Sequence, residues 1–273
     1  MTSTEIKIKL RHLYDAALTA VSKGADITVT NSALTEQAIE ALRPPRYDLT
    51  QFTLCLPVDK AGEPSGLAAY VTPAPVLPAL AQPFVKQYQD SLLITCPIKG
   101  ATTKSVHRAR CEFQALPAAE FTTSEPKRHE VAFIFRKPAD LPGMKVGDEI
   151  VIAQFHCGQF PMVKIKARLD AAGFTLRAAV KHEAVRGAPD TYYTLAQAVP
   201  FDLPQVLVME WLPVNDAVPQ HLLFSINGLP VPPKAVPMDY PLTAGIAPTF
   251  GIYWQKEWVT GEPLRYACME FVK

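Results

Sequence analysis

From residue 46 to the end, the sequence repeats one pattern, in which short runs rich in β-branched and aromatic residues alternate with turn-forming residues. Most of these runs are bounded by some of the 26 prolines and 13 glycines. Many short strands with turns between them predict an all-β domain, either a β-sandwich, a jelly roll or a barrel. The predicted strands are 52–58, 91–98, 108–115, 130–136, 149–156, 163–169, 175–180, 205–211, 222–226, 249–254 and 266–272. Asn227 and Gly228 stand between two alternating apolar stretches, which predicts a two-residue β-hairpin.

Residues 1–45 follow a different pattern. Leu10 and Val21 belong to an apolar series with helical spacing, which predicts one amphipathic helix, and a second short helix is predicted to end before Pro44. Two such helices cannot bury their apolar faces alone. We therefore expect this helical extension either to pack on the main domain, residues 46–273, or to join subunits in a homo-oligomer.

Charge and cysteine content exclude several classes of protein. The formal net charge of +1 argues against a dedicated nucleic-acid-binding protein, because affinity for phosphates requires many cationic contacts. The longest apolar runs are too short to cross a membrane. The first residues lack the pattern of a secretory signal, which favours a cytoplasmic location. Five widely spaced cysteines in apolar surroundings predict reduced, buried thiols, and no Cys/His spacing indicates zinc.

The predicted strand 149–156 combines an apolar beginning with a polar end. Because side chains alternate across a strand, Ile150, Ile152, Gln154 and His156 are all predicted to point to one face. Either Gln154 and His156 are satisfied polar groups of the core, or this face opens into a groove that binds a ligand.

Two other predicted strands also present polar side chains on one face. Arg108, Arg110 and Glu112 share a face in one strand, and Tyr253 shares a face with Gln255 in the other. On adjacent strands, these residues would bring Arg, Gln, His and Tyr side chains into one groove. Such a set suits removal of a proton next to a carboxylate, since Arg neutralises the carboxylate and His or Tyr transfers protons.

Four sequence motifs, in this order, resemble those of polysaccharide lyase family 7, the alginate lyases. The resemblance runs from about residue 47 to the C-terminus. It implies a concanavalin A-like β-jelly roll, that is, a sandwich of two antiparallel sheets, and cleavage of an acidic uronate polymer by β-elimination. The motifs are YDLTQFTLCLPVD at 47–59, GATTKSVHRARCEF at 100–113, QFH at 154–156 and APTFGIYWQ at 247–255.

The resemblance also implies roles for single residues. Arg110 and Gln154 are expected to neutralise the substrate carboxylate, His156 to assist them or to act as the base, and Tyr253 to act as the acid and, for some epimers, as the base. Glu112 is expected to orient Arg110. The apolar end of strand 149–156 would then be core, and its Gln-His end the floor of the groove.

Further residues are expected to bind the substrate. Arg108 and Gln255 lie within two of the motifs, although Arg108 can equally form a surface salt bridge. Lys164, Lys166 and Arg168 share one face of a predicted strand, which indicates either a rail of cations for an acidic polymer or a solvated outer face.

Other conspicuous residues are expected to have structural positions. The sequence predicts that four histidines lie at the surface, namely His107, His129, His182 and His221, and that Trp254 packs in the core. No metal or organic cofactor is expected, and the expected partner is an acidic polysaccharide or oligosaccharide.

The sequence departs from the family motifs at several positions. Thr249 replaces the usual Lys, Ala247 replaces a Tyr, Gln114 stands where a basic residue often follows, and Phe155 occupies the middle of the Gln-x-His motif. These departures leave open a lyase for another uronan, such as glucuronan, and a non-catalytic carbohydrate-binding jelly roll. An extracellular polymer as substrate also conflicts with the expected cytoplasmic location.

Overall fold

The computed structural model describes most of the chain after residue 48. The predicted helical extension, residues 1–45, and the homo-oligomer expected through it lie outside the described residues, and so does His107, which was expected at the surface. The described ranges are 49–71, 77–88, 91–103, 108–116, 120, 125–158, 160–214, 220–232, 235–242 and 244–272.

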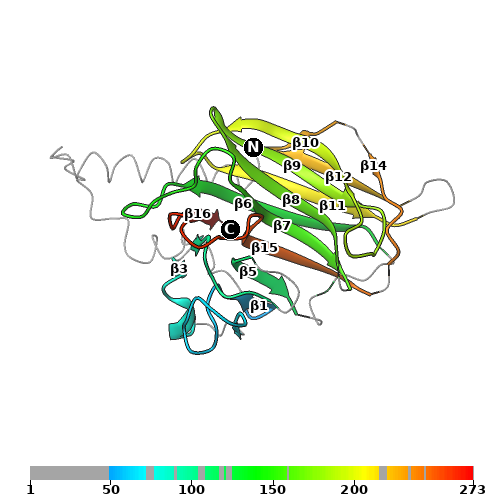
Figure 1. The fold of residues 1–273 in the computed structure, drawn as a ribbon. Coiled ribbons are helices and arrows are strands. Elements are labelled where there is room, and N and C mark those ends of the chain that lie inside the picture. The colour runs from blue at the N-terminus through cyan, green and yellow to red at the C-terminus, as the bar shows by residue number, and fades with distance from the viewer. Residues whose placement is uncertain are drawn as a thin grey trace, which may run out of the picture.

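Two antiparallel sheets pack face to face and confirm the predicted all-β jelly-roll sandwich (Figure 1). The first sheet has the order β10 (Asp190–Val199), β9 (Gly173–Lys181), β8 (Phe160–Asp170), β7 (Glu149–Cys157), β15 (Ile246–Trp254), β5 (Arg110–Ala115), β1 (Phe52–Cys55) and β2 (Tyr70–Val71). The second has the order β13 (Leu229–Pro230), β12 (His221–Ile226), β11 (Gln205–Leu212), β6 (Lys127–Arg136), β16 (Tyr266–Val272), β4 (Ser91–Pro97) and β3 (Val85–Gln87), with β14 (Val236–Pro237) beside β12. The described residues also contain a short 3₁₀ helix, η1 (Ala79–Ala81).

The hydrophobic core fills the space between the sheets. Alternate residues of each strand enter it, such as Cys111 and Phe113 of β5. Trp254 is fully buried there, as predicted, and its indole Nε1 donates a hydrogen bond to the Cys96 carbonyl at 3.1 Å. The intervening residues of the first sheet, including Arg110 and Glu112, point to the opposite side. We call this side, which is turned away from the second sheet, the outer face.

The predicted hairpin at Asn227 and Gly228 is confirmed. Ile226 of β12 is opposite Leu229 of β13, so only two residues form the turn. Both have positive φ angles, 52° for Asn227 and 81° for Gly228, as a type I′ turn requires.

A β-bulge interrupts the alternation of strand β7. Val151 is opposite Lys166 of β8 and Ala153 is opposite Ile165, so Ile152 is an extra residue without a partner. Ile152 and Ala153 both face the core in this bulge, so the alternation counted from Ile150 is shifted by one residue beyond it.

This bulge corrects the prediction that one face of the strand carries both isoleucines and the Gln-His pair. Ile150, Ile152 and Phe155 all belong to the core. Gln154 and His156 lie on the outer face instead. The polar end of the strand therefore does not continue its apolar face.

Strand β10 has no counterpart among the predicted strands. It forms the edge of the first sheet, and of its ten residues only Leu195 and Val199 are buried. An edge strand with little buried surface has weak hydrophobic alternation, which explains why the sequence pattern did not reveal it.

Candidate active site

Strand pairing brings the four predicted catalytic residues together on the outer face of three adjacent strands. Arg110 of β5 is directly opposite Tyr253 of β15. Thr249 of β15 is directly opposite Gln154 of β7, and His156 follows two residues later on the same face. Arg, Gln, His and Tyr side chains thus form one cluster at the centre of the sheet.

Glu112 is the carboxylate around which this cluster is organised. It is 6% exposed and accepts hydrogen bonds from the Gln154 amide and from the Thr249 hydroxyl, the latter at 3.3 Å. Its other oxygen lies 3.5 Å from Arg110 Nη1. Burial raises the pKa of Glu112, and Arg110 and the two hydrogen bonds oppose this shift. The contact is consistent with the predicted orienting role of Glu112.

The Arg110 guanidinium packs on the ring of Tyr253, 4.0 Å from the ring centre. Burial acts to lower the pKa of Arg110, but the neighbouring Glu112 carboxylate raises it above its usual range. Its buried Nε atom has no hydrogen-bond partner among the described residues. A fixed cation with an unused donor is suited to bind an anion.

His156 is uncharged at neutral pH. Burial, together with the charges of Arg110 and Lys164, lowers its pKa to about 4. A neutral imidazole can accept a proton or donate one hydrogen bond, but it cannot supply a positive charge.

The structure corrects the solvated-face alternative for Lys164 and Lys166. Lys164 is opposite Gln154, and its Nζ lies 2.7 Å from Asp190. Lys166 is 9% exposed and forms an ion pair with Glu149 at 2.9 Å. Both lysines are held at the sheet by carboxylates, and their contact with substrate stays a prediction.

The two remaining predicted substrate contacts flank the cluster. Arg108 is half-buried just before β5. Gln255 follows the end of β15, where its side-chain amide is within 3.5 Å of the main-chain carbonyls of Tyr253 and Trp254. Their roles also stay predictions.

Gly251 allows β15 to approach β5 closely. Its φ angle is 142°, and a Cβ atom at this position would collide with the Cys111 carbonyl. It lies between Thr249 and Tyr253, beside the bulge of β7. This glycine therefore helps to set the distance between the two side chains at the site.

Sequence reasoning missed two residues on the β1–β2 side of the cluster. Cys55 is directly opposite both Glu112 and Tyr70, and its thiol and the Tyr70 hydroxyl share a hydrogen bond. Burial raises the pKa of Cys55 to about 11, so the thiol is not a nucleophile. Strict alternation in β1 would have placed Cys55 on the outer face.

His129 of β6, predicted to lie at the surface, is half-buried, and its ring packs behind the cluster. Its ring is 5.9 Å from the Phe155 ring and donates a hydrogen bond to the Thr249 carbonyl. Its buried Nε2 has no partner among the described residues. Burial lowers the pKa of His129 to about 4. The alternating charges around it in the sequence had suggested exposure.

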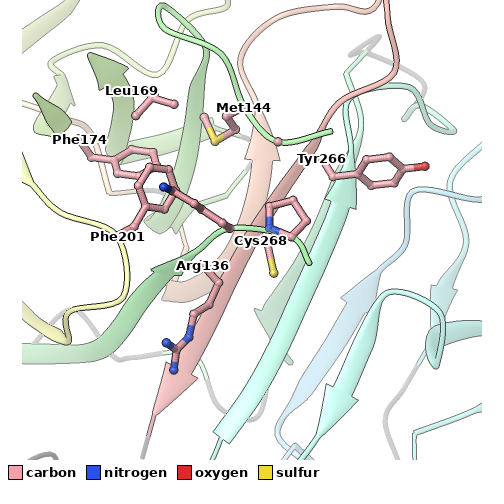
Figure 2. A pocket seen from close by; sticks show the side chains of 10 residues that line it. Arg136, Met144, Leu169, Phe174, Phe201, Tyr266 and Cys268 are labelled. Carbon is pink, nitrogen blue, oxygen red and sulfur yellow. The ribbon is translucent and has the colours of Figure 1, made fainter. Parts of the chain in front are cut away.

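A cavity of about 280 Å³ lies away from this cluster. Figure 2 shows Met144, Leu169, Phe174 and Phe201 in it, and the two phenylalanine rings meet edge to face at 5.0 Å. Two cations line it: Arg136 is paired with Glu270, and Lys137 Nζ lies 5.2 Å from the centre of the Phe201 ring. This largely apolar lining lacks the acid–base set of the cluster.

Two other kinds of site are not found in the described part of the chain. These residues contain no group of three or more His, Cys, Asp and Glu side chains that could hold a metal ion. They also contain no helix long and apolar enough to cross a membrane.

Comparison with known proteins adds evidence on family and fold. A family model described as alginate lyase matches residues 47–211, whereas no curated protein sequence matches. An alginate lyase of Pseudomonas aeruginosa has 17% identity and a TM-score of 0.59 over 81% of this chain and 96% of its own. The alginate lyase of Klebsiella pneumoniae has 15% identity and a TM-score of 0.59, over 83% and 95%. That of Corynebacterium sp. has 16% identity and a TM-score of 0.60, over 84% and 97%.

At these identities, the structural likeness establishes the fold. Two further matches are variants of the alginate lyase A1-II′, one in complex with a product (GGG) and one with a substrate (GGMG).

Proposed function

The chain belongs to the alginate lyases of polysaccharide lyase family 7, and on this premise we propose that it cleaves an acidic uronate polymer, alginate first, by endolytic β-elimination. One observation carries this proposal. Arg110 is fixed by Glu112 beside Tyr253 and keeps a buried donor that has no partner in the part of the chain that the structure describes.

The reaction begins at the carbon next to the uronate carboxylate. A carboxylate makes the adjacent C–H bond hard to ionise unless its negative charge is neutralised. Arg110 supplies the permanent cation, and Gln154 supplies an amide beside it. Because Glu112 already holds both side chains, little reorganisation is needed when the substrate binds.

Proton transfer completes the reaction. A base removes the proton, a double bond forms within the sugar ring, and the bond to the glycosidic oxygen breaks. An acid protonates that oxygen as it leaves. We assign the acid to Tyr253, and the base to His156 or to Tyr253 according to the uronate epimer. His156 can be the base because its low pKa keeps it neutral near pH 7.

The test is to incubate the protein with alginate, its mannuronate and guluronate blocks, glucuronan and pectate, and to follow the ultraviolet absorbance of the unsaturated uronate product. A rise that is lost in Arg110→Ala and Tyr253→Phe supports the proposal. Activity on pectate alone, or turnover that survives both substitutions, contradicts it.

One feature favours a second uronan. Thr249 is 1% exposed and is bonded to Glu112, so the cation found here in the family motif is replaced by a neutral buried group. If the protein cleaves glucuronan and no other uronan, glucuronan replaces alginate as the proposed substrate. Binding without turnover on any uronan would identify a carbohydrate-binding protein instead.

A further inference from the structure

Three strands on one side of the cluster carry an aromatic side chain beside paired cations (β8, β9 and β10 in Figure 1). Lys166 of β8 is directly opposite Arg177 of β9, and Tyr192 of β10 is opposite Ala179 of β9. All of them lie on the outer face, since Ile165 and Ala178 between them enter the core. This flank and the catalytic cluster therefore share one surface.

Tyr192 is held in place but remains accessible. Its hydroxyl accepts a hydrogen bond from Lys166 Nζ at 3.2 Å. Lys166 Nζ and the Arg177 guanidinium each lie 5.2 Å from its ring centre. Nevertheless, 47% of the residue is exposed. An aromatic ring that is fixed and exposed is suited to pack against the apolar side of a sugar.

The ionic groups of the flank carry an excess of positive charge. Glu149 accepts hydrogen bonds from both Lys166, at 2.9 Å, and Arg177, at 2.6 Å. Likewise, Lys164 and Lys181 lie 2.7 Å and 3.6 Å from the single carboxylate of Asp190. Four cations in these two groups thus face two carboxylates.

Arg177 also has an unused donor. Its buried Nε has no hydrogen-bond partner among the described residues, although its Nη2 is bonded to Glu149. Desolvated cations that share a carboxylate attract a further anion. A uronate unit has the complementary chemistry, with a carboxylate for the cations and a ring for the aromatic side chain.

We propose that Tyr192, Lys166 and Arg177 form a distal subsite that binds an acidic sugar unit of the polymer while cleavage occurs at Tyr253. This inference rests on the proposed function. Tyr253, Val151, Lys166 and Arg177 are successive partners across four strands, so Tyr253 and Arg177 are roughly 14 Å apart. This distance exceeds one sugar unit, so the subsite holds a unit that is not being cleaved.

The test compares Tyr192→Ala with Tyr88→Ala. Tyr88 is also 47% exposed but follows β3 of the second sheet, so its substitution controls for loss of an exposed tyrosine. For a uronate polymer, we expect Tyr192→Ala to raise KM about tenfold at unchanged kcat. The shortest oligosaccharide that is cleaved should show no such change, because it cannot reach the subsite. Tyr88→Ala should match the wild type on both substrates.

Arg177→Gln gives an independent measurement. It should weaken the dependence of KM on salt, because one cation near the polymer is lost. Equal KM values for the wild type and Tyr192→Ala on the polymer would overturn the subsite. So would an equal rise in KM on polymer and short substrate.

If the proposed lyase activity is wrong, the subsite can still be tested by binding. If the wild type turns over no uronan, calorimetric titration with the same polymers replaces the kinetic assay. Binding that is weaker in Tyr192→Ala than in Tyr88→Ala would still support the subsite. Equal binding by the two variants, or no binding by the wild type, would overturn it.

Discussion

Replacing His129 by Asn should make the protein less sensitive to acid. His129 is neutral in the folded protein, where burial lowers its pKa from 6.5 to about 4, and its ring donates to the Thr249 carbonyl. An Asn side chain can keep that hydrogen bond but cannot titrate. The comparison therefore isolates the proton uptake of one buried imidazole.

The sign follows from which state binds the proton. Below pH 6.5 the unfolded chain protonates its histidine, whereas the folded protein does not until about pH 4. The neutral His129 side chain thus contributes its full stability above pH 6.5, and this contribution is lost as the pH falls from 6.5 towards 4. Between pH 7 and pH 5, a pKa of 6.5 against 4 gives a loss of about 2 kcal/mol in the free energy of unfolding. His156 has the same shift and adds a similar loss.

The assay is urea unfolding of the wild type, His129→Asn and His182→Asn at pH 7 and pH 5. The His182 side chain is 33% exposed and serves as the control histidine. We expect His129→Asn to lose about 2 kcal/mol less than the wild type between the two pH values, and His182→Asn to lose as much as the wild type. Equal losses in all three proteins would refute the assignment of a buried neutral imidazole.

Three other substitutions or modifications test contacts at the cluster. Thr249→Val removes a hydrogen bond to the buried Glu112 carboxylate and should lower kcat about tenfold, whereas Thr249→Ser should retain activity. Equal kcat values for the two variants would count against this contact. Gly251→Ala forces a Cβ against the Cys111 carbonyl at a φ of 142° and should destabilise the protein by more than about 2 kcal/mol in urea unfolding. Native Cys55, with its pKa raised by burial to about 11, should resist iodoacetamide at pH 7 but react after unfolding, as peptide mass spectrometry can measure. Rapid labelling of the folded protein would contradict its burial.

Much of the fold and the centre of the site could be predicted because both follow from local periodicity. Runs such as 266–272 were readable as strands, and the Asn227 turn was readable from its residue types. The motifs placed Arg110 and Tyr253 on strands that proved to be partners. Here the local pattern and the final contacts agree.

The remaining features depend on contacts between distant residues. The bulge at Ile152 appears only in the register with β8. The burial of the His129 ring depends on Phe155 in the opposite sheet, and the ion pair of Lys166 depends on Glu149, which Arg177 shares. No pattern within one strand encodes such pairings.

The extra residue in β7 has a consequence for transplanting this chemistry. A designer who grafts residues 150–156 onto a regular strand of another sandwich would copy the reactive groups but not the face to which they point. In a strand without the bulge, strict alternation over these seven residues would place Gln154 and His156 on the same face as Ile150, pointing into the core. Conversely, deleting Ile152 would remove the extra residue and place Ala153 directly after Val151, so the strand should become regular and still present Gln154 and His156 on the outer face.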